Sequence, residues 1–307
     1  MKKHTDMKKI LISVILVTLS LPGSAFGRRN HATVNFIAFQ HLNAHAKAAV
    51  NEILQGETFW EHGSYPDDYR LDLLVPLDAS LLMTDEDGKP VLKGPDGKPF
   101  CYGTDFFVDE KGNNLTTIAH GWYASADFKY VEVPYGECVW YIRQVIGELK
   151  NWKKLPQERR FKALVVLAHL VGDMHCPTHI HYTDKWDGND GKYNVEYGGR
   201  SVRYHSAWDT NILVDRYQGG PLDFATSVDP FLSGSLSKSE AGKQLKAVQD
   251  GTLEDWCAQI SEDVHCVYEI KEGDELTAKK VNDMLPLGRK MVCQAGYRLA
   301  KILNDTL

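Results

Sequence analysis

The sequence predicts a mainly α-helical protein that forms one multi-helix domain, with a β-ribbon inserted at about residues 71–117. Apolar residues recur at helical spacing along most of the 307-residue chain, and hydrophobic residues make up 43% of it, enough for a sizeable core. The segment 71–117 departs from this pattern because it is rich in Gly, Asp and Lys. No linker composition and no solenoid repeat divides the chain. We therefore expect a single helical domain with one insertion.

Residues 1–25 are predicted to be a secretory signal peptide. Four lysines precede a twelve-residue apolar run at residues 10–21, and the small residues Gly23 and Ala25 are placed for cleavage. The run is short for a transmembrane helix, so an uncleaved anchor is the lesser alternative. We expect cleavage after Ala25, a mature chain of residues 26–307 that begins at Phe26, and a periplasmic or secreted location.

Helices are expected in order along the mature chain. Residues 34–42 carry apolar side chains at helical spacing, and Asn43 is suited to cap a second helix. Pro156 suits the first turn of the strongest helical pattern, in which apolar residues from Phe161 to Ala168 share a face. In the insertion, DGKPV at residues 87–91 is repeated as DGKPF, which indicates turns between short strands. Further helices are expected at residues 138–149, 207–217, 252–268 and 277–303.

Two histidine–aspartate pairs carry the candidate chemistry. His169 and Asp173 are four residues apart on the predicted helix, so both side chains leave the same face. His205 and Asp209 repeat this spacing, and His179 follows the first pair closely enough to turn toward it. One such histidine is more often a hydrogen-bonded structural residue, but two pairs and His179 together favour a metal cage. Imidazole and carboxylate donors without paired thiolates suit zinc in a catalytic site.

Three neighbours of these pairs have less certain roles on sequence grounds. His175 and His181 point away from the face that His169 and Asp173 share, which favours supporting or surface roles. Cys176 could be a thiolate ligand, but a buried or disulfide-bonded cysteine is the commoner case. Six cysteines in an exported chain permit disulfide bonds, and the sequence does not choose among their pairings.

The charge of the chain limits how it could hold a polyanion. Removal of residues 1–25 takes away four lysines and one aspartate, which changes the formal net charge from −6 to −9. This charge argues against a broad basic surface that grips nucleic acid electrostatically. A polyanionic substrate must be met by local positive charge, such as bound metal ions.

The motif HLVGDMHCPTH at residues 169–179, followed by HSAWDT at residues 205–210, resembles the signature of a known family. It is similar to the zinc-dependent single-strand nucleases of fungi, plants and bacteria, the S1/P1 nucleases, whose fold is shared with bacterial zinc phospholipase C. Members begin with Trp-Gly and place a ligand histidine five residues after the first residue, and here Phe26-Gly27 is followed by His31. The resemblance implies a helical domain of the phospholipase C/nuclease type with three Zn²⁺ ions.

The family's ligands can be carried over residue by residue. YPDDYR supplies Asp67 and Arg70, and His120 in AHGWYA is the one histidine between Asp67 and His169. The resemblance implies that Phe26 would bind through its free amino group and carbonyl oxygen. The implied first zinc is held by Asp67, His120, His169 and Asp173, the second by His179, His205 and Asp209, and the third by Phe26, His31 and the bridging Asp173.

The implied activity is that of a zinc-dependent endonuclease, a phosphodiester hydrolase acting on single-stranded DNA or RNA. It would break the P–O3′ bond to give 5′-phosphate products, with 3′-nucleotidase activity as a further expectation. Asp67 would orient the attacking water and Arg70 would hold phosphate oxygens, while Trp122 and Tyr123 are candidates to stack against bases. No stable membrane anchor and no protein partner is expected.

Two alternatives stay open from sequence. A zinc-dependent phospholipase C has a similar cage, but it typically ends with glutamate and a closer last histidine, so Asp209 and the gap between His179 and His205 favour the nuclease. A zinc-binding protein without catalysis is the other alternative, because the insertion could block the substrate groove.

Overall fold

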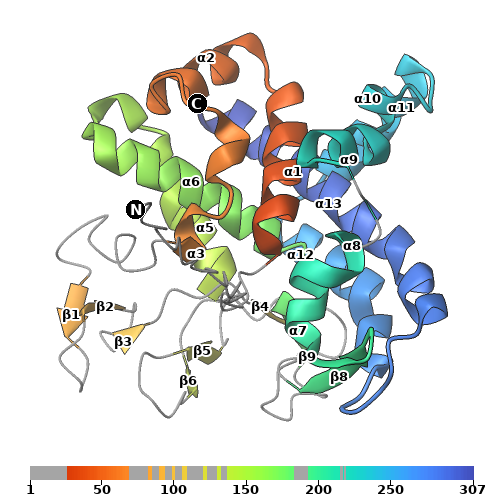
Figure 1. Ribbon diagram of the computed structural model, residues 1–307. Coiled ribbons are helices and arrows are strands. Elements are labelled where there is room, and N and C mark those ends of the chain that lie inside the picture. Colours follow the sequence, from red (N-terminus) through yellow and green to blue (C-terminus); the bar gives the residue numbers. More distant parts are fainter. Residues whose placement is uncertain are drawn as a thin grey trace, which may run out of the picture.

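The described part of the chain is mainly helical, as the sequence predicts (Figure 1). The computed structural model describes residues 26–68, 82–84, 90–93, 99–100, 106–108, 120–122, 130–132, 137–182, 193–214, 217 and 219–307. The predicted signal peptide at residues 1–25 lies outside these residues. None of the described helices is both long enough and apolar enough to cross a membrane.

Helix α1 (Gly27–Gln40) packs against the long C-terminal helix α13 (Ala278–Thr306) in the middle of the molecule (Figure 1). Asn43 caps α2 (Ala44–Ile53) as predicted, because its side-chain oxygen accepts a hydrogen bond from the backbone N–H of Ala46. A 3₁₀ turn η1 (Phe59–His62) and the short helix α3 (Tyr65–Asp68) then lead into the insertion.

Helix α6 (Gln157–Asp173) is the predicted strong helix, and all of its residues from Ala163 to Asp173 are buried. It packs on α5 (Glu137–Leu149), α1, α3 and α13, so its second half is enclosed on every side. Each fully buried Leu or Val on such a face stabilises the fold by about 1.5–3 kcal/mol. The α-helix ends before Pro177, as expected, and a 3₁₀ turn η4 (Pro177–His179) follows.

The second predicted histidine–aspartate pair lies after a β-hairpin. Strands β8 (Asn194–Tyr197) and β9 (Arg200–Arg203) are antiparallel and are joined through Gly198 and Gly199, both at positive φ. The chain then forms α7 (Tyr204–Ser206), the π-helical segment η5 (Ala207–Asn211) and α8 (Ile212–Val214). The helix predicted at residues 207–217 is therefore a π-turn continued by α8, and π-turns are frequent at functional sites.

The C-terminal third is helical. Helices α12 (Leu253–Val264) and α13 confirm two predicted helices, and Thr252 and Thr277 cap them. Three further helices were not predicted because their apolar faces are short and partly exposed. Those three are α9 (Pro221–Val228), α10 (Pro230–Ser233) and α11 (Lys238–Gln249).

The insertion contains strands, as predicted. β1 (Leu82–Thr84), β2 (Pro90–Lys93) and β3 (Pro99–Phe100) pair antiparallel, and the two DGKP repeats lead into β2 and β3. β4 (Phe106–Val108) pairs in parallel with β7 (Ile180–Tyr182), which follows His179 directly. The insertion is therefore joined by backbone hydrogen bonds to the segment that carries the predicted metal cage.

Candidate metal centre

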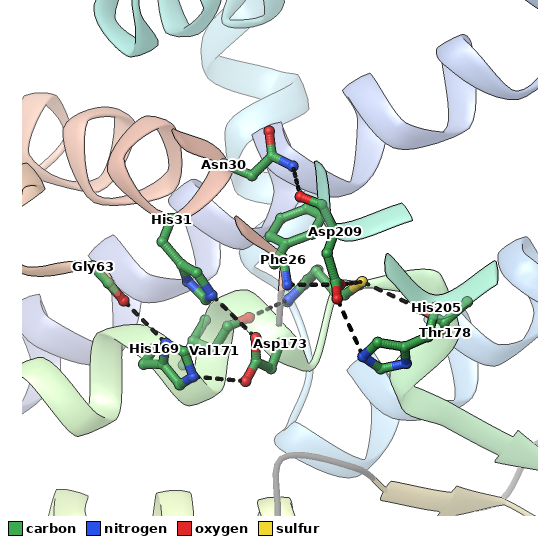
Figure 2. Close-up of polar contacts among 12 residues, drawn as sticks. Phe26, Asn30, His31, Gly63, His169, Val171, Asp173, Thr178, His205 and Asp209 are labelled. Carbon is green, nitrogen blue, oxygen red and sulfur yellow. Dashed lines mark hydrogen bonds and ion pairs between the residues drawn. The ribbon is translucent and has the colours of Figure 1, made fainter. Parts of the chain in front are cut away.

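His31, His169 and Asp173 form the first cluster, in the fully buried space between α1 and α6 (Figure 2). Nε2 of His31 lies 3.1 Å from Oδ1 of Asp173, and Nε2 of His169 lies 3.0 Å from Oδ2. The two imidazole rings stack with their centroids 4.2 Å apart. The i,i+4 spacing on α6 therefore brings His169 to Asp173 as predicted, and α1 supplies His31 from a distant part of the sequence.

Two glycines make room for the His31 side chain. A Cβ atom on Gly172 would lie 2.6 Å from His31 Nδ1, and one on Gly63 would lie 2.6 Å from His31 Cβ. The ring thus packs against the backbone of α6 at Gly172, and the base of the side chain packs against the segment after η1 at Gly63. Any larger residue at position 172 would have to displace the ring.

The hydrogen bonding of His169 suits a cation between it and Asp173. A carbonyl oxygen can only accept, so His169 Nδ1 donates its proton to the backbone oxygen of Gly63 at 3.0 Å. In the neutral ring, Nε2 then presents a lone pair to the Asp173 carboxylate. A nitrogen lone pair and a carboxylate oxygen repel each other at 3.0 Å, so a proton or a metal ion must lie between His169 Nε2 and Asp173 Oδ2. Metal-binding histidines commonly donate their other nitrogen to a backbone carbonyl in this way.

Cys176, His179, His205 and Asp209 form the second cluster. One donor atom each from Cys176, His179 and Asp209 lies within 4.8 Å of the others, and all three residues are buried. His205 Nε2 lies 3.3 Å from Asp209 Oδ2, and the rings of His205 and His179 are 4.6 Å apart. The His205 side chain is 23% exposed, so this cluster is the more accessible one.

Phe26 lies at the second cluster. Its backbone nitrogen donates to Asp209 Oδ1 at 2.8 Å, and its buried ring meets His31 edge-to-face (Figure 2). Phe26 has a φ of 47°, and Gly27 follows at 57° where a Cβ would lie 2.3 Å from the Asp209 carbonyl oxygen. The chain start of the predicted mature protein thus reaches the candidate centre, where its nitrogen contacts Asp209, an implied ligand of the second zinc.

The two aspartates have opposite electrostatic environments. Burial alone would raise the pKa of Asp173, but the surrounding imidazoles outweigh it and hold this pKa far below its usual range. Burial raises the pKa of Asp209 to about 7, since His179 and the Phe26 N–H offset it only partly and Asp173 adds negative charge. Burial, with these carboxylates nearby, also raises the pKa of the Cys176 thiol well above its usual value.

A buried arginine supports the segment between the clusters. Arg298 on α13 donates to Nε2 of His175 at 3.0 Å, while His175 Nδ1 donates to the carbonyl of Val171 at 2.7 Å. Burial and the adjacent guanidinium lower the pKa of His175 well below its usual value. The neutral ring therefore links α6 to α13, which matches the supporting role predicted for His175.

The donor geometry fits zinc. Two nitrogen or oxygen ligands on one tetrahedral zinc lie about 3.3 Å apart, given bonds of about 2.0 Å. The distances of 3.0, 3.1 and 3.3 Å between imidazole and carboxylate atoms are close to this value. Both oxygens of Asp173 and Oδ2 of Asp209 are buried without a hydrogen-bond donor among the described residues. Metal ions would satisfy these atoms.

For the remaining predicted site residues, the structure gives at most the helix or strand on which each one lies. Asp67 lies in α3, which packs against α6, and His120 and Trp122 lie on β5 (His120–Trp122), paired with β6 (Tyr130–Glu132). Arg70 and Tyr123 lie outside the described residues. The roles of these five residues therefore stay predictions.

The cysteines differ from expectation. The four described thiols are free, so disulfide bonding, which the sequence permits, is not found among them. Cys176 is buried, as the sequence favoured, and its thiol also belongs to a possible ligand group, the role that the sequence left as the lesser alternative. The sequence feature that pointed to a ligand role was the position of Cys176 inside the histidine-rich motif. The four free thiols are Cys176, Cys257, Cys266 and Cys293.

Comparison with known proteins places this arrangement in a family. The curated relatives include Endonuclease 2 of Arabidopsis thaliana, 28% identical over 153 residues, which are 47% of this chain and 51% of that protein. Nuclease S1 of Aspergillus oryzae is 24% identical over 156 residues, 46% of this chain and 53% of that protein. Nuclease P1 of Penicillium citrinum is 23% identical over 298 residues, 91% and 97% of the two chains.

The chain thus spans about half the length of the first two relatives and nearly all of the third. The profile of the S1/P1 nuclease family matches residues 26–307, and this match begins at Phe26. It covers both clusters and every described helix. The chain belongs to the S1/P1 nuclease family.

Proposed function

We propose that this protein is an exported, zinc-dependent endonuclease that hydrolyses single-stranded DNA or RNA to 5′-phosphate products, with 3′-nucleotidase activity. The observation that carries the proposal is the meeting of two histidine–aspartate groups at zinc-ligand spacing, the first fully buried and the second partly exposed at His205. The family match over residues 26–307 and relatives named as nucleases and endonucleases support it. Cleavage after Ala25 is part of the proposal, and the start of the family match at Phe26 supports it.

Three zinc ions are proposed, with ligands as the resemblance implies. His169 and Asp173 would hold one ion, together with Asp67 and His120. His179, His205 and Asp209 would hold another, and the amino group of Phe26 with His31 and Asp173 the third. When bound, zinc supplies a water molecule of lowered pKa and positive charge against the phosphate.

The chain's own residues prepare the site for this chemistry. The hydrogen bond from His169 Nδ1 to Gly63 fixes the ring so that Nε2 faces Asp173. The ionised Asp173 sits between His31 and His169, and its two oxygens face different rings. Because the chain carries a net charge of −6, the site itself must provide the attraction for a polyanion. Arg70 is proposed to hold the phosphate, and Trp122 and Tyr123 to stack against bases.

The test compares substrates on the secreted, processed protein. We expect single-stranded DNA or RNA to be cut to 5′-phosphate ends, with duplex DNA cut much more slowly and phosphatidylcholine vesicles left intact. A chelator should stop the reaction, and added zinc should restore it. Hydrolysis of phosphatidylcholine in place of nucleic acid would instead identify a phospholipase, and bound zinc without turnover of either would identify a binding protein.

Export and processing have their own measurement. The mass and N-terminal sequence of the protein recovered outside the cytoplasm should begin at Phe26. A start elsewhere, or retention of residues 1–25 in the active protein, would contradict the proposed cleavage.

A further inference from the structure

The thiol of Cys176 occupies the centre of the second cluster. Cys176 follows α6 at the start of η4 and is fully buried. Its Sγ lies 3.4 Å from Asp209 Oδ1 and 3.6 Å from Thr178 Oγ1. Its Sγ, one nitrogen of His179 and one oxygen of Asp209 are all within 4.8 Å of one another. The thiol therefore faces the same space as the donor atoms of the proposed centre.

The spacing is that of two ligands on one ion. Sulfur and oxygen ligands on a tetrahedral zinc, with bonds of about 2.3 and 2.1 Å, lie about 3.6 Å apart. The 3.4 Å between Cys176 Sγ and Asp209 Oδ1 is close to this value. A weak S–H···O hydrogen bond spans a similar distance, so a second observation is needed to choose between them.

That second observation is the other oxygen of Asp209. Oδ2 is buried without a hydrogen-bond donor among the described residues, and it lies 3.3 Å from His205 Nε2. A hydrogen bond from the thiol satisfies Oδ1 but does nothing for Oδ2. An ion held among the thiol, the imidazoles and the carboxylate would satisfy the whole group.

We propose that Cys176 supplies a thiolate ligand to the metal of the second cluster, beside His179, His205 and Asp209. The inference rests on the metal centre of the proposed function. On binding, the S–H bond breaks, sulfur binds the metal, and the proton leaves to solvent. The two clusters then differ in donor chemistry, because the first offers nitrogen and oxygen and the second also offers sulfur. Thiolate ligands favour zinc, and a set of four protein donors is typical of firmly held ions.

Cobalt is the probe, because Co²⁺ replaces Zn²⁺ and shows an intense near-ultraviolet charge-transfer band only where sulfur binds it. The processed protein is stripped with a chelator and titrated with Co²⁺, with bound cobalt measured by elemental analysis. We expect this band in the wild type and its loss in Cys176→Ala. The matched control is Cys257→Ala, since Cys257 is also a buried free thiol but lies on α12 beside Arg298 and Arg143.

Cys176→Ser serves as a second variant of nearly the same size, and circular dichroism checks that each variant is folded. The wild-type spectrum tests the proposal even if both Cys176 variants fail to fold. Bound cobalt without the sulfur band, or a band that persists in Cys176→Ala, overturns thiolate binding but leaves the proposed metal centre standing. Wild-type protein that binds no cobalt overturns both.

Discussion

The two clusters share a histidine–aspartate pair at the same spacing, yet their carboxylates behave in opposite ways. Asp173 is held ionised because imidazoles from α1 and α6 face both of its oxygens. Asp209 has its pKa raised to about 7, because burial outweighs the lowering effects of His179, the Phe26 N–H and the Cys176 thiol, and because Asp173 adds negative charge nearby. The repeated spacing therefore fixes which atoms meet but not their charge, which depends on residues distant in sequence.

The clusters also differ in their supporting backbone. The first lies at the end of a regular 17-residue helix and is fully buried. The second is built from a 3₁₀ turn, a one-turn helix and a π-helical segment, and His205 is partly exposed. We infer that the first cluster is the more rigid half and that the second can be reached from solvent.

The largest effect is expected from Asp173→Asn, which removes the carboxylate shared by two histidines. Loss of a partner that merely supports a metal ligand costs about 10- to 100-fold in affinity or activity, so loss of this carboxylate should cost more than about 100-fold. Metal content should fall with it, as elemental analysis and nuclease assays can measure. Asp283→Asn, an exposed carboxylate on α13, is the control. Full activity and metal content in Asp173→Asn would disprove the cluster assignment.

The next effect separates helix stability from site geometry. Gly172→Ala should improve helix propensity but place a Cβ 2.6 Å from His31 Nδ1, so the ring would have to shift. We expect normal helix content with reduced metal binding at the first cluster. Gly147→Ala on α5 meets nothing within 4 Å and should raise the free energy of unfolding by about 0.5–1 kcal/mol with no change in metal content. Equal metal binding by both variants would contradict the packing of His31.

A smaller effect should appear in the pH dependence of the metal-free protein. The folded pKa of Asp209 is about 7 and its unfolded pKa about 4, so the stability linked to this group is present below pH 4 and is lost as pH rises toward 7. Asp209→Asn keeps an oxygen acceptor for the Phe26 N–H but cannot ionise. The variant should therefore not lose stability between about pH 4 and about pH 7 through this group. Urea unfolding of the chelated protein from pH 4.5 to 7.5 measures it.

Asp173 should respond with the opposite sign in the same experiment. Its folded pKa is lowered, so its ionised form contributes stability above the unfolded pKa, and that contribution is lost as pH falls through the folded value. Asp173→Asn should therefore lower the urea midpoint at neutral pH. If the urea midpoint at neutral pH shifted in the same direction in Asp173→Asn and Asp209→Asn, the proposed difference between the two carboxylates would be wrong.

The smallest effect is expected from His181→Ala. His181 lies on β7, two residues after His179, and is not among the zinc ligands that the resemblance implies. Most of the nuclease activity and all of the bound metal should remain. Loss of one metal ion from this variant would add His181 to the second cluster.

The features that could be predicted from the sequence are those set by short-range patterns. The i,i+4 pairs, the cap at Asn43 and the end of α6 before Pro177 depend on residues within a few positions of one another. His31 and Phe26 could be placed only through the resemblance, because the Phe26–Asp209 contact joins residues 183 positions apart. The roles of Asp67 and His120 still rest on the resemblance alone.

Other features had no sequence signal strong enough to be predicted. The Cys176–Asp209 contact depends on the turn that follows α6, and the raised pKa of Asp209 depends on packing around it. Helices α9 and α10 have proline in the first turn and α11 has a serine cap, but all three carry few buried residues, so their apolar pattern is weak.

The left-handed φ of Phe26 has a consequence for maturation. This torsion is defined by the carbonyl carbon of residue 25, and an L-residue held there costs roughly 1–2 kcal/mol. The proposed cut after Ala25 would delete that atom and the penalty with it, and would leave a free amine beside the buried Asp209 carboxylate. Signal removal would thus relieve backbone strain and create the terminal amine at the same residue.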